Sequence, residues 1–161
     1  MIAVASRLGP ALAAGLLGCA LLSGCGADPG PRDSGGTVTA PADVDAYALR
    51  LGDCTGPVTT GSASRFTLLP CGEEHSWEVF AATDLAGDDF PGAVKVQSQA
   101  EAFCNDQFTS FVGKPVAKSG YHLIVLQPTK QTWTSAGDRA VTCLAGSRDG
   151  GVTGTLKGAA A

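Results

Sequence analysis

The stretch AVKVQSQAEAFCNDQFTSFV, residues 93–112, decides the fold of this chain. At 100° per residue, its apolar side chains gather on one side of a helix, within an arc of about 120°. They are Val96, Ala100, Phe103, Cys104, Phe108 and Phe111. Polar residues occupy the other sides. The pattern predicts one long amphipathic helix whose apolar stripe packs against a second layer of structure.

Strand-like segments precede this helix. Apolar and polar residues alternate over 47–51, 65–71 and 76–83, with turn residues between these segments. In the third segment, Trp77, Val79 and Ala81 are expected to share one face, because side chains two or four positions apart point the same way along a strand.

Further elements follow the helix. Residues 121–126 are apolar on both faces apart from one histidine, which is typical of a central strand. A short helical turn is expected over 128–137, and a last strand over 139–145. One main helix packed on a four- to five-stranded, mostly antiparallel sheet predicts a small α+β domain.

The tetrapeptide Leu22-Ser23-Gly24-Cys25 matches a bacterial lipobox, with an aliphatic residue and two small residues before a cysteine. Arg7 supplies a positive n-region, and Leu8–Leu22 is an uncharged apolar run that is too short to span a bilayer. We therefore predict that residues 1–24 are a lipoprotein signal peptide and that Cys25 is lipidated. The alternative is an ordinary secretory signal that frees the protein. Cys19 is a poorer lipidation candidate.

Residues 25–45 are predicted to form the lipidated cysteine and a flexible tether, followed by one domain over 46–158. The tether is rich in Gly, Pro, Ser, Asp and Thr, and Val38 and Val44 are its only large aliphatic residues. These features predict a protein held on the extracytoplasmic face of the cell membrane, with the lipid bilayer as its partner through Cys25. The chain carries a net charge of −4, which argues against nucleic-acid binding.

Four cysteines lie in the predicted domain: Cys54, Cys71, Cys104 and Cys143. An even number of cysteines in an exported chain indicates a disulfide framework, and four cysteines allow three pairings. We favour Cys54–Cys71, which closes a short strand-loop-strand segment, and Cys104–Cys143, which ties the helix to the last strand. Chain-entropy arguments give about 3 and about 4 kcal/mol for these two loops.

The candidate binding residues are Glu74, His75 and Trp133. His75, together with nearby acidic residues, is the one cluster with the makings of acid–base chemistry, although a charged turn that caps a strand is the simpler interpretation. A zinc site through Cys71 and His75 is a weak alternative, since no CxxC partner exists. No GxSxG, HExxH or SxxK motif occurs. We therefore expect no catalytic residues, no metal and no cofactor.

Several short motifs resemble those of a known family. They are Leu51-Gly52-Asp53-Cys54, Leu69-Pro70-Cys71, Glu74-His75-x-x-Glu78-Val79-Phe80, Phe90-Pro91-Gly92, Pro128-Thr129, Trp133-x3-Gly137-Asp138-Arg139-x3-Cys143 and Gly154-Thr155-Leu156-Lys157-Gly158. Over residues 47–158 the chain is similar to the septum formation family of actinobacterial envelope proteins. The resemblance implies a small anchored or exported domain whose four cysteines are structural pairs, and it supplies no catalytic residues.

These observations predict a membrane-anchored extracytoplasmic lipoprotein that is not an enzyme. We expect it to act as a binding or scaffolding module in the cell envelope, linked to septum formation, with envelope or division proteins as partners. The alternative is a receptor domain for a small extracellular solute. A redox-active protein is disfavoured because no CxxC motif exists.

Overall fold

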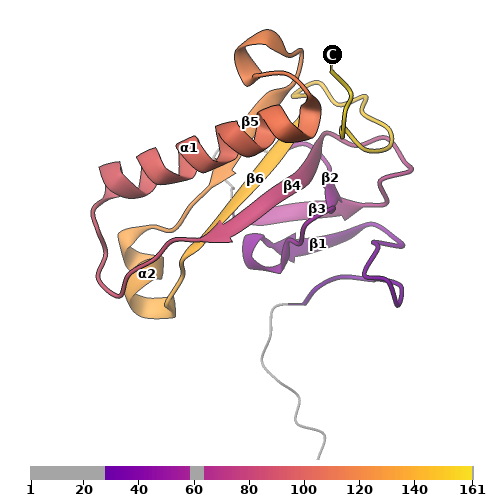
Figure 1. Ribbon diagram of the computed structural model, residues 1–161. Coiled ribbons are helices and arrows are strands. Elements are labelled where there is room, and N and C mark those ends of the chain that lie inside the picture. Colours follow the sequence, from indigo (N-terminus) through magenta and orange to yellow (C-terminus); the bar gives the residue numbers. More distant parts are fainter. Residues whose placement is uncertain (1–27, 59–63, 161) are drawn as a thin grey trace, which may run out of the picture.

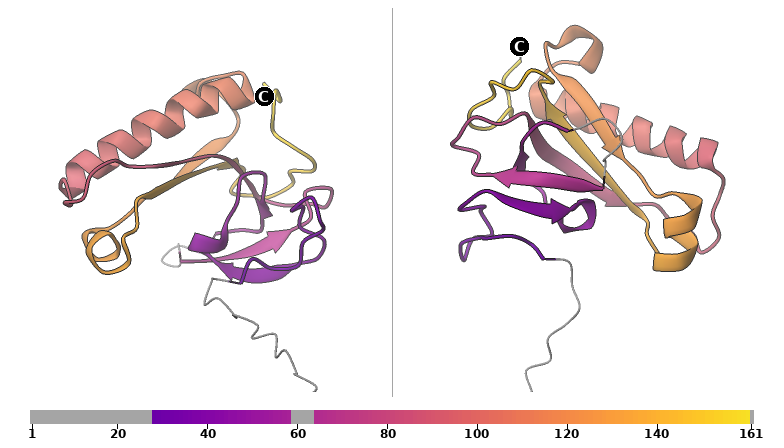
Figure 2. Two further views of the ribbon diagram at one scale, coloured as in Figure 1. Left: turned by 60° about the horizontal axis from the view of Figure 1, so that its bottom comes forward. Right: turned by 180° about the vertical axis from the view of Figure 1, so that it is seen from behind.

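The computed structural model describes residues 28–58 and 64–160. These residues form a curled antiparallel sheet with one long helix across its face (Figures 1 and 2). The sheet has six strands in the order β1-β3-β2-β4-β6-β5. The strands are β1 (Ala42–Asp45), β2 (Cys54–Thr55), β3 (Arg65–Leu69), β4 (Trp77–Asp84), β5 (His122–Leu126) and β6 (Ala140–Gly146). The helices are α1 (Ala93–Val112), α2 (Lys130–Ala136) and the short 3-10 turns η1 (Ala46–Ala48) and η2 (Val116–Lys118). The predicted α+β class is confirmed.

The helix α1 has the predicted bounds and most of the predicted apolar stripe; Phe103 and Phe111 are half-buried, and Val112 joins the buried side. Val96, Ala100, Cys104 and Phe108 are fully buried against the sheet. The helix ends where Gly113 adopts a left-handed conformation, with φ of 93°, and donates its N–H to the carbonyl of Thr109. Glycine enters this conformation without a Cβ penalty, so it fixes the length of the helix.

The sheet buries both of its faces. One apolar cluster joins α1 to the sheet and includes Phe108, Cys143 and Ala145. A second cluster covers the opposite face and includes Phe66 and Leu144. Cys143, Leu144 and Ala145 are consecutive in β6, and they alternate between the two clusters as strand geometry requires.

A bulge in β4 changes which side chains share a face of this strand. The pairing of β4 with β6 shifts between Val79 and Ala81, so that Phe80 is the extra residue. Trp77 and Val79 lie in the second cluster, whereas Phe80 and Ala81 lie in the cluster beneath α1. The predicted shared face is confirmed for Trp77 and Val79 and wrong for Ala81, because the added residue reverses the alternation.

Strand β5 lies at the edge of the sheet, where a central strand was expected. Leu123 and Val125 pack toward the α1 cluster, and Ile124 and Leu126 pack toward the second cluster. Both faces of the strand therefore need apolar residues even though only one edge of it is paired. The run of apolar residues correctly indicated two covered faces, but it carried no information about the edges.

The N-terminal part of the described chain is folded, which shortens the predicted tether. Val38 and Val44 are 5% and 2% exposed, and residues 42–45 pair with β3 as β1. The strand predicted over 47–51 is absent; this segment holds most of η1 and a turn, and Tyr47 and Leu51 are exposed. The place beside β3 is taken by β1. Val44 in this strand and Val38 before it are buried in the second cluster, and this burial stabilises a segment that shows no periodicity in the sequence.

Both predicted disulfides are present. Cys54 joins Cys71 with their Cα atoms 5.2 Å apart, and Cys104 joins Cys143 with a Cα separation of 5.5 Å. The first connects β2 to the turn after β3, and the second ties α1 to β6. Cys25 and the predicted signal peptide lie outside the described residues. No helix within 28–58 and 64–160 is long and apolar enough to cross a membrane.

Candidate functional site

His75 is buried, at 2% exposure, two residues before the start of β4. Its Nδ1 atom lies 2.9 Å from the carbonyl oxygen of Glu73, which accepts a hydrogen bond from it. Its backbone exchanges two hydrogen bonds with Val152 in the C-terminal segment. Its Nε2 atom is buried and has no hydrogen-bond partner among the described residues. The histidine thus joins the start of β4 to the C-terminal segment and does not face solvent.

The acidic residues around His75 have separate surroundings. Glu74 is exposed. Glu78 is 5% exposed, and its two carboxylate oxygens accept hydrogen bonds of 2.7 Å from the backbone N–H of Leu156 and the hydroxyl of Thr155. These bonds satisfy a buried carboxylate and hold the C-terminal segment over the sheet. Glu78 is therefore a positioning residue for the last part of the chain.

Trp133, the third candidate binding residue, is buried at 2% exposure and is part of the frame. Its indole N–H donates to the carbonyl of Asp88 at 2.9 Å, and the Arg139 guanidinium lies 3.7 Å from its ring centroid. Asp88 follows β4 whereas His75 precedes it, so the two candidates lie at opposite ends of that strand. Glu74 and His75 are neighbours in the chain, but Glu74 is exposed while His75 is buried, and Trp133 lies apart from both.

The structure contradicts the alternative of a zinc site through Cys71 and His75. Cys71 is bonded to Cys54, so its sulfur is not a thiolate. Within the described residues, no three His, Cys, Asp or Glu side chains are grouped closely enough to hold a metal ion.

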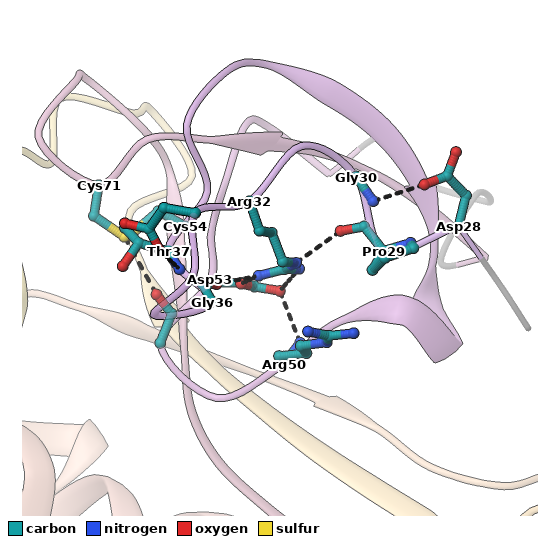
Figure 3. A network of polar contacts seen from close by, with 12 residues as sticks. Asp28, Pro29, Gly30, Arg32, Gly36, Thr37, Arg50, Asp53, Cys54 and Cys71 are labelled. Carbon is teal, nitrogen blue, oxygen red and sulfur yellow. Dashed lines mark hydrogen bonds and ion pairs between the residues drawn. A yellow bond between two sulfur atoms is a disulfide. The ribbon is translucent and has the colours of Figure 1, made fainter.

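A buried ion pair that the sequence did not reveal joins Arg32 to Asp53 (Figure 3). The two guanidinium nitrogens lie 2.6 and 2.8 Å from the two carboxylate oxygens, and the side chains are only 6% and 3% exposed. Asp53 also accepts from the backbone N–H of Arg50 at 2.7 Å. The hydrogen bond to Asp53 raises the pKa of Arg32 above its ordinary value. The pair pins residues 28–38 to the turn before β2.

An open groove of about 340 Å³ lies between η1 and the ends of β5 and β6. We call it the β5 groove. Its lining is mainly apolar with hydroxyl groups around it, and Asp138 supplies the one charged side chain of that lining. The lining residues are Ala46, Tyr47, Ser64, Val125, Leu126, Gln127, Thr129, Thr132, Asp138, Ala140 and Thr142. An apolar concavity with a few convergent polar groups is the common form of a binding site.

Local structure fixes the walls of this groove. Thr129 caps α2, with its hydroxyl accepting from the N–H of Thr132 while the Thr132 hydroxyl accepts from the N–H of Thr129. Gly137 ends the helix in a left-handed conformation, and Asp138 then accepts from the N–H of Ala140 at 3.0 Å. The groove wall is therefore held by short-range hydrogen bonds on each side of α2.

The fold and its two disulfides define a small stapled α+β domain. A family model described as septum formation matches residues 36–160. The chain belongs to this family, and the family description links it to septum formation. The match begins at residue 36, ahead of the predicted domain start at 46, in agreement with the folded position of β1. A search of curated proteins and a search of solved structures each found no match.

Sequence reasoning missed the β5 groove and the Arg32–Asp53 pair. The groove is built from residues distant in the chain, from Ala46 to Thr142, and no local pattern joins them. The ion pair had a signal: Arg32 is the only basic residue in the segment 26–45, and Asp53 lies within the Leu51-Gly52-Asp53-Cys54 motif.

Proposed function

We propose that this protein is a lipid-anchored extracytoplasmic module that binds an envelope component through the β5 groove and has no catalytic role. The observation that carries the proposal is an open, mainly apolar groove on a frame stapled by two disulfides. The candidate acid–base groups support it, because His75 and Glu78 are buried and hold the C-terminal segment. The septum formation family gives the setting for such binding.

The anchor rests on the lipobox at Cys25. A diacylglyceryl group gives two acyl chains, which suffice for stable membrane attachment where one chain does not. The folded domain begins near Asp28, so it would be held close to the bilayer on a short connection, in place of the long tether predicted from composition.

The anchor is tested by Cys25→Ala in the full chain, with Cys19→Ala as the matched control. We expect Cys25→Ala to release the protein from membranes or to trap the precursor, and Cys19→Ala to leave both unchanged. Fractionation and intact-mass measurement of the acyl modification give the result. A processed Cys25→Ala protein that stays in the membrane fraction contradicts the lipoprotein proposal.

The binding role is tested by proximity labelling in living cells from a tag after Ala161, with Cys25 intact. Ala140→Arg fills the β5 groove, and Ala93→Arg places the same side chain at the exposed start of α1 as a control. We expect septal and wall-synthesis proteins to be enriched, and this enrichment to be lost in Ala140→Arg alone. Equal labelling by both variants contradicts binding through the groove.

A receptor for a small solute is the second candidate, and the groove volume favours it. Small-molecule sites commonly occupy about 300–1,000 Å³, a range that includes this groove. Saturable stabilisation of the purified domain by one compound, lost in Ala140→Arg, would support this function, because a ligand that binds only the folded state raises its melting temperature. Unchanged melting across a broad panel of solutes would contradict it.

A further inference from the structure

Strand β5 is an edge strand, and among residues 28–58 and 64–160 nothing pairs with its outer side. Its inner side pairs with β6 without interruption, from His122 opposite Gly146 to Leu126 opposite Thr142. No backbone hydrogen bond from any other described element reaches its residues. A row of free N–H and C=O groups is a template for another extended backbone.

The strand itself carries no charged residue, proline or bulge that would protect this edge. Natural proteins shield free edges with charged residues, proline or a bulge. The strand reads HLIVL, without Lys, Arg, Asp, Glu or Pro, and its pairing with β6 has no bulge. Its four apolar side chains are all half-buried, so each retains surface that a neighbouring strand would cover.

The β5 groove continues from this edge. Val125 and Leu126 belong both to the strand and to the lining of the groove, and Gln127 follows directly. A strand added to β5 would therefore place alternate side chains over the groove, since side chains along a strand alternate between its two faces. Main-chain hydrogen bonds give affinity in such complexes, and pockets for alternate side chains give specificity.

We propose that the β5 edge receives an extended segment of another envelope protein as a seventh strand. The free backbone groups identify the ligand as a polypeptide. The apolar lining calls for apolar side chains at alternate positions, and Asp138 calls for a basic residue near them. A second copy of β5 would bring no Lys or Arg within its strand, and each copy carries a net charge of −4, so charge complementarity favours a different chain. This inference rests on the proposed function and names its partner class.

The test is site-specific photocrosslinking in living cells that carry the full chain. A benzophenone amino acid replaces His122, the first residue of β5, in one strain and Gln127, directly after its last residue, in a second; both positions are exposed. In a third strain it replaces Asp43 on β1, at the opposite edge of the sheet, as the control. Mass spectrometry then identifies the crosslinked residue in each product.

We expect the probes at 122 and 127 to crosslink to one segment of one protein, at residues about five positions apart, because both strands advance by about 3.4 Å per residue. We expect no such product from position 43, and an at least tenfold loss of crosslinking in Leu126→Lys, which protects the edge with a charge. The wild-type spacing does not depend on whether this variant folds.

Several outcomes would overturn the inference. They are products with a second copy of this chain, products in unrelated segments, products equally strong from position 43, and no products at all. If the proximity labelling still depends on Ala140 while the crosslinks fail, the groove binds its partner without strand addition. If the groove dependence also fails, the proposed function itself is wrong.

Discussion

The two edge strands of the sheet, β1 and β5, differ in how far other residues of the chain cover and protect them. At the β1 end, Asp43 and Asp45 project polar side chains, and residues 28–38 run alongside and are fixed by the buried Arg32–Asp53 pair. At the β5 end, the outer strand has no Lys, Arg, Asp or Glu, and no described element pairs with its outer side. Within the described residues, the chain protects the β1 edge and pairs nothing with the β5 edge, which is why we propose partner binding at β5.

The N-terminal loop beside β1 is itself well ordered by hydrogen bonds and close packing. Arg32 also donates to the carbonyls of Pro29 and Gly36 at 2.8 and 3.0 Å, so one guanidinium organises the whole N-terminal loop. Gly30 approaches Leu68 so closely that an added Cβ would lie 3.1 Å from it. These contacts close one side of the sheet, whereas the groove at the other side is open.

The largest expected effect comes from breaking the ion pair at the β1 end. Asp53→Ala leaves the Arg32 charge buried without its partner, which costs about 3–5 kcal/mol of unfolding free energy. Urea denaturation of the oxidised domain measures this loss. Asp45→Ala is the control, since its pair with Arg65 is more than half exposed and contributes at most about 1 kcal/mol. Equal losses for the two variants would show that the β1 end is not held by the buried pair.

The expected losses of stability from removing each of the two disulfides are closer to each other than those of the two ion-pair variants. Replacing both Cys104 and Cys143 by Ser removes a crosslink across 39 positions, with an expected loss of about 4 kcal/mol. The same change at Cys54 and Cys71 opens 17 positions and costs about 3 kcal/mol. Paired replacement avoids leaving a free thiol. Denaturation of the two double variants gives the ranking; a larger loss at Cys54–Cys71 would mean that the β1 end depends on its crosslink more than chain entropy predicts.

Arg139 supports the wall near the β5 groove, and its removal is expected to cost about 2 kcal/mol. Its guanidinium donates to the carbonyls of Gly87, Asp88 and Trp133 and lies over the Trp133 ring. Hydrogen bonds from a charged donor and a cation–π contact each contribute on this scale. Arg139→Ala is compared by thermal melting with Arg148→Ala, an exposed arginine beyond β6. A shift no larger than that of Arg148→Ala would contradict this role.

The sequence predicted what periodicity and cysteine spacing encode. The bounds of α1, most of its buried stripe and both disulfides are confirmed, because the amphipathic pattern and the position of Cys104 are local properties. Sheet order is not local. The apolar run of β5 indicated two covered faces, but it could not show whether the strand lies at the edge or the centre of the sheet. Strand β1 lies in a segment whose composition is typical of a linker, and it is held by contacts with residues distant in the sequence.

The candidate site was predicted less well, for a related reason. His75 and Trp133 stood out as rare residue types, but both are buried parts of the frame. The β5 groove is formed by common residues such as Ala140 and Thr142, which meet only after the sheet has curled. Rarity in a sequence therefore identified residues that fix the fold, while the binding surface depends on tertiary arrangement.

The smallest expected loss of stability comes from removing the N-cap of α2, and it tests whether the groove wall at the β5 end is held independently of the β1 end. Thr129→Val keeps the shape of the side chain but removes the N-cap of α2, at a cost of about 1 kcal/mol. Thr134→Val, on an exposed position of the same helix, is the control and should change stability by less than about 0.5 kcal/mol. Hydrogen exchange at single amides should show faster exchange in α2 and unchanged protection in β1 for Thr129→Val. Faster exchange in both regions would mean that the two ends open together, and the separation between a closed β1 end and an independently held groove wall would then be wrong.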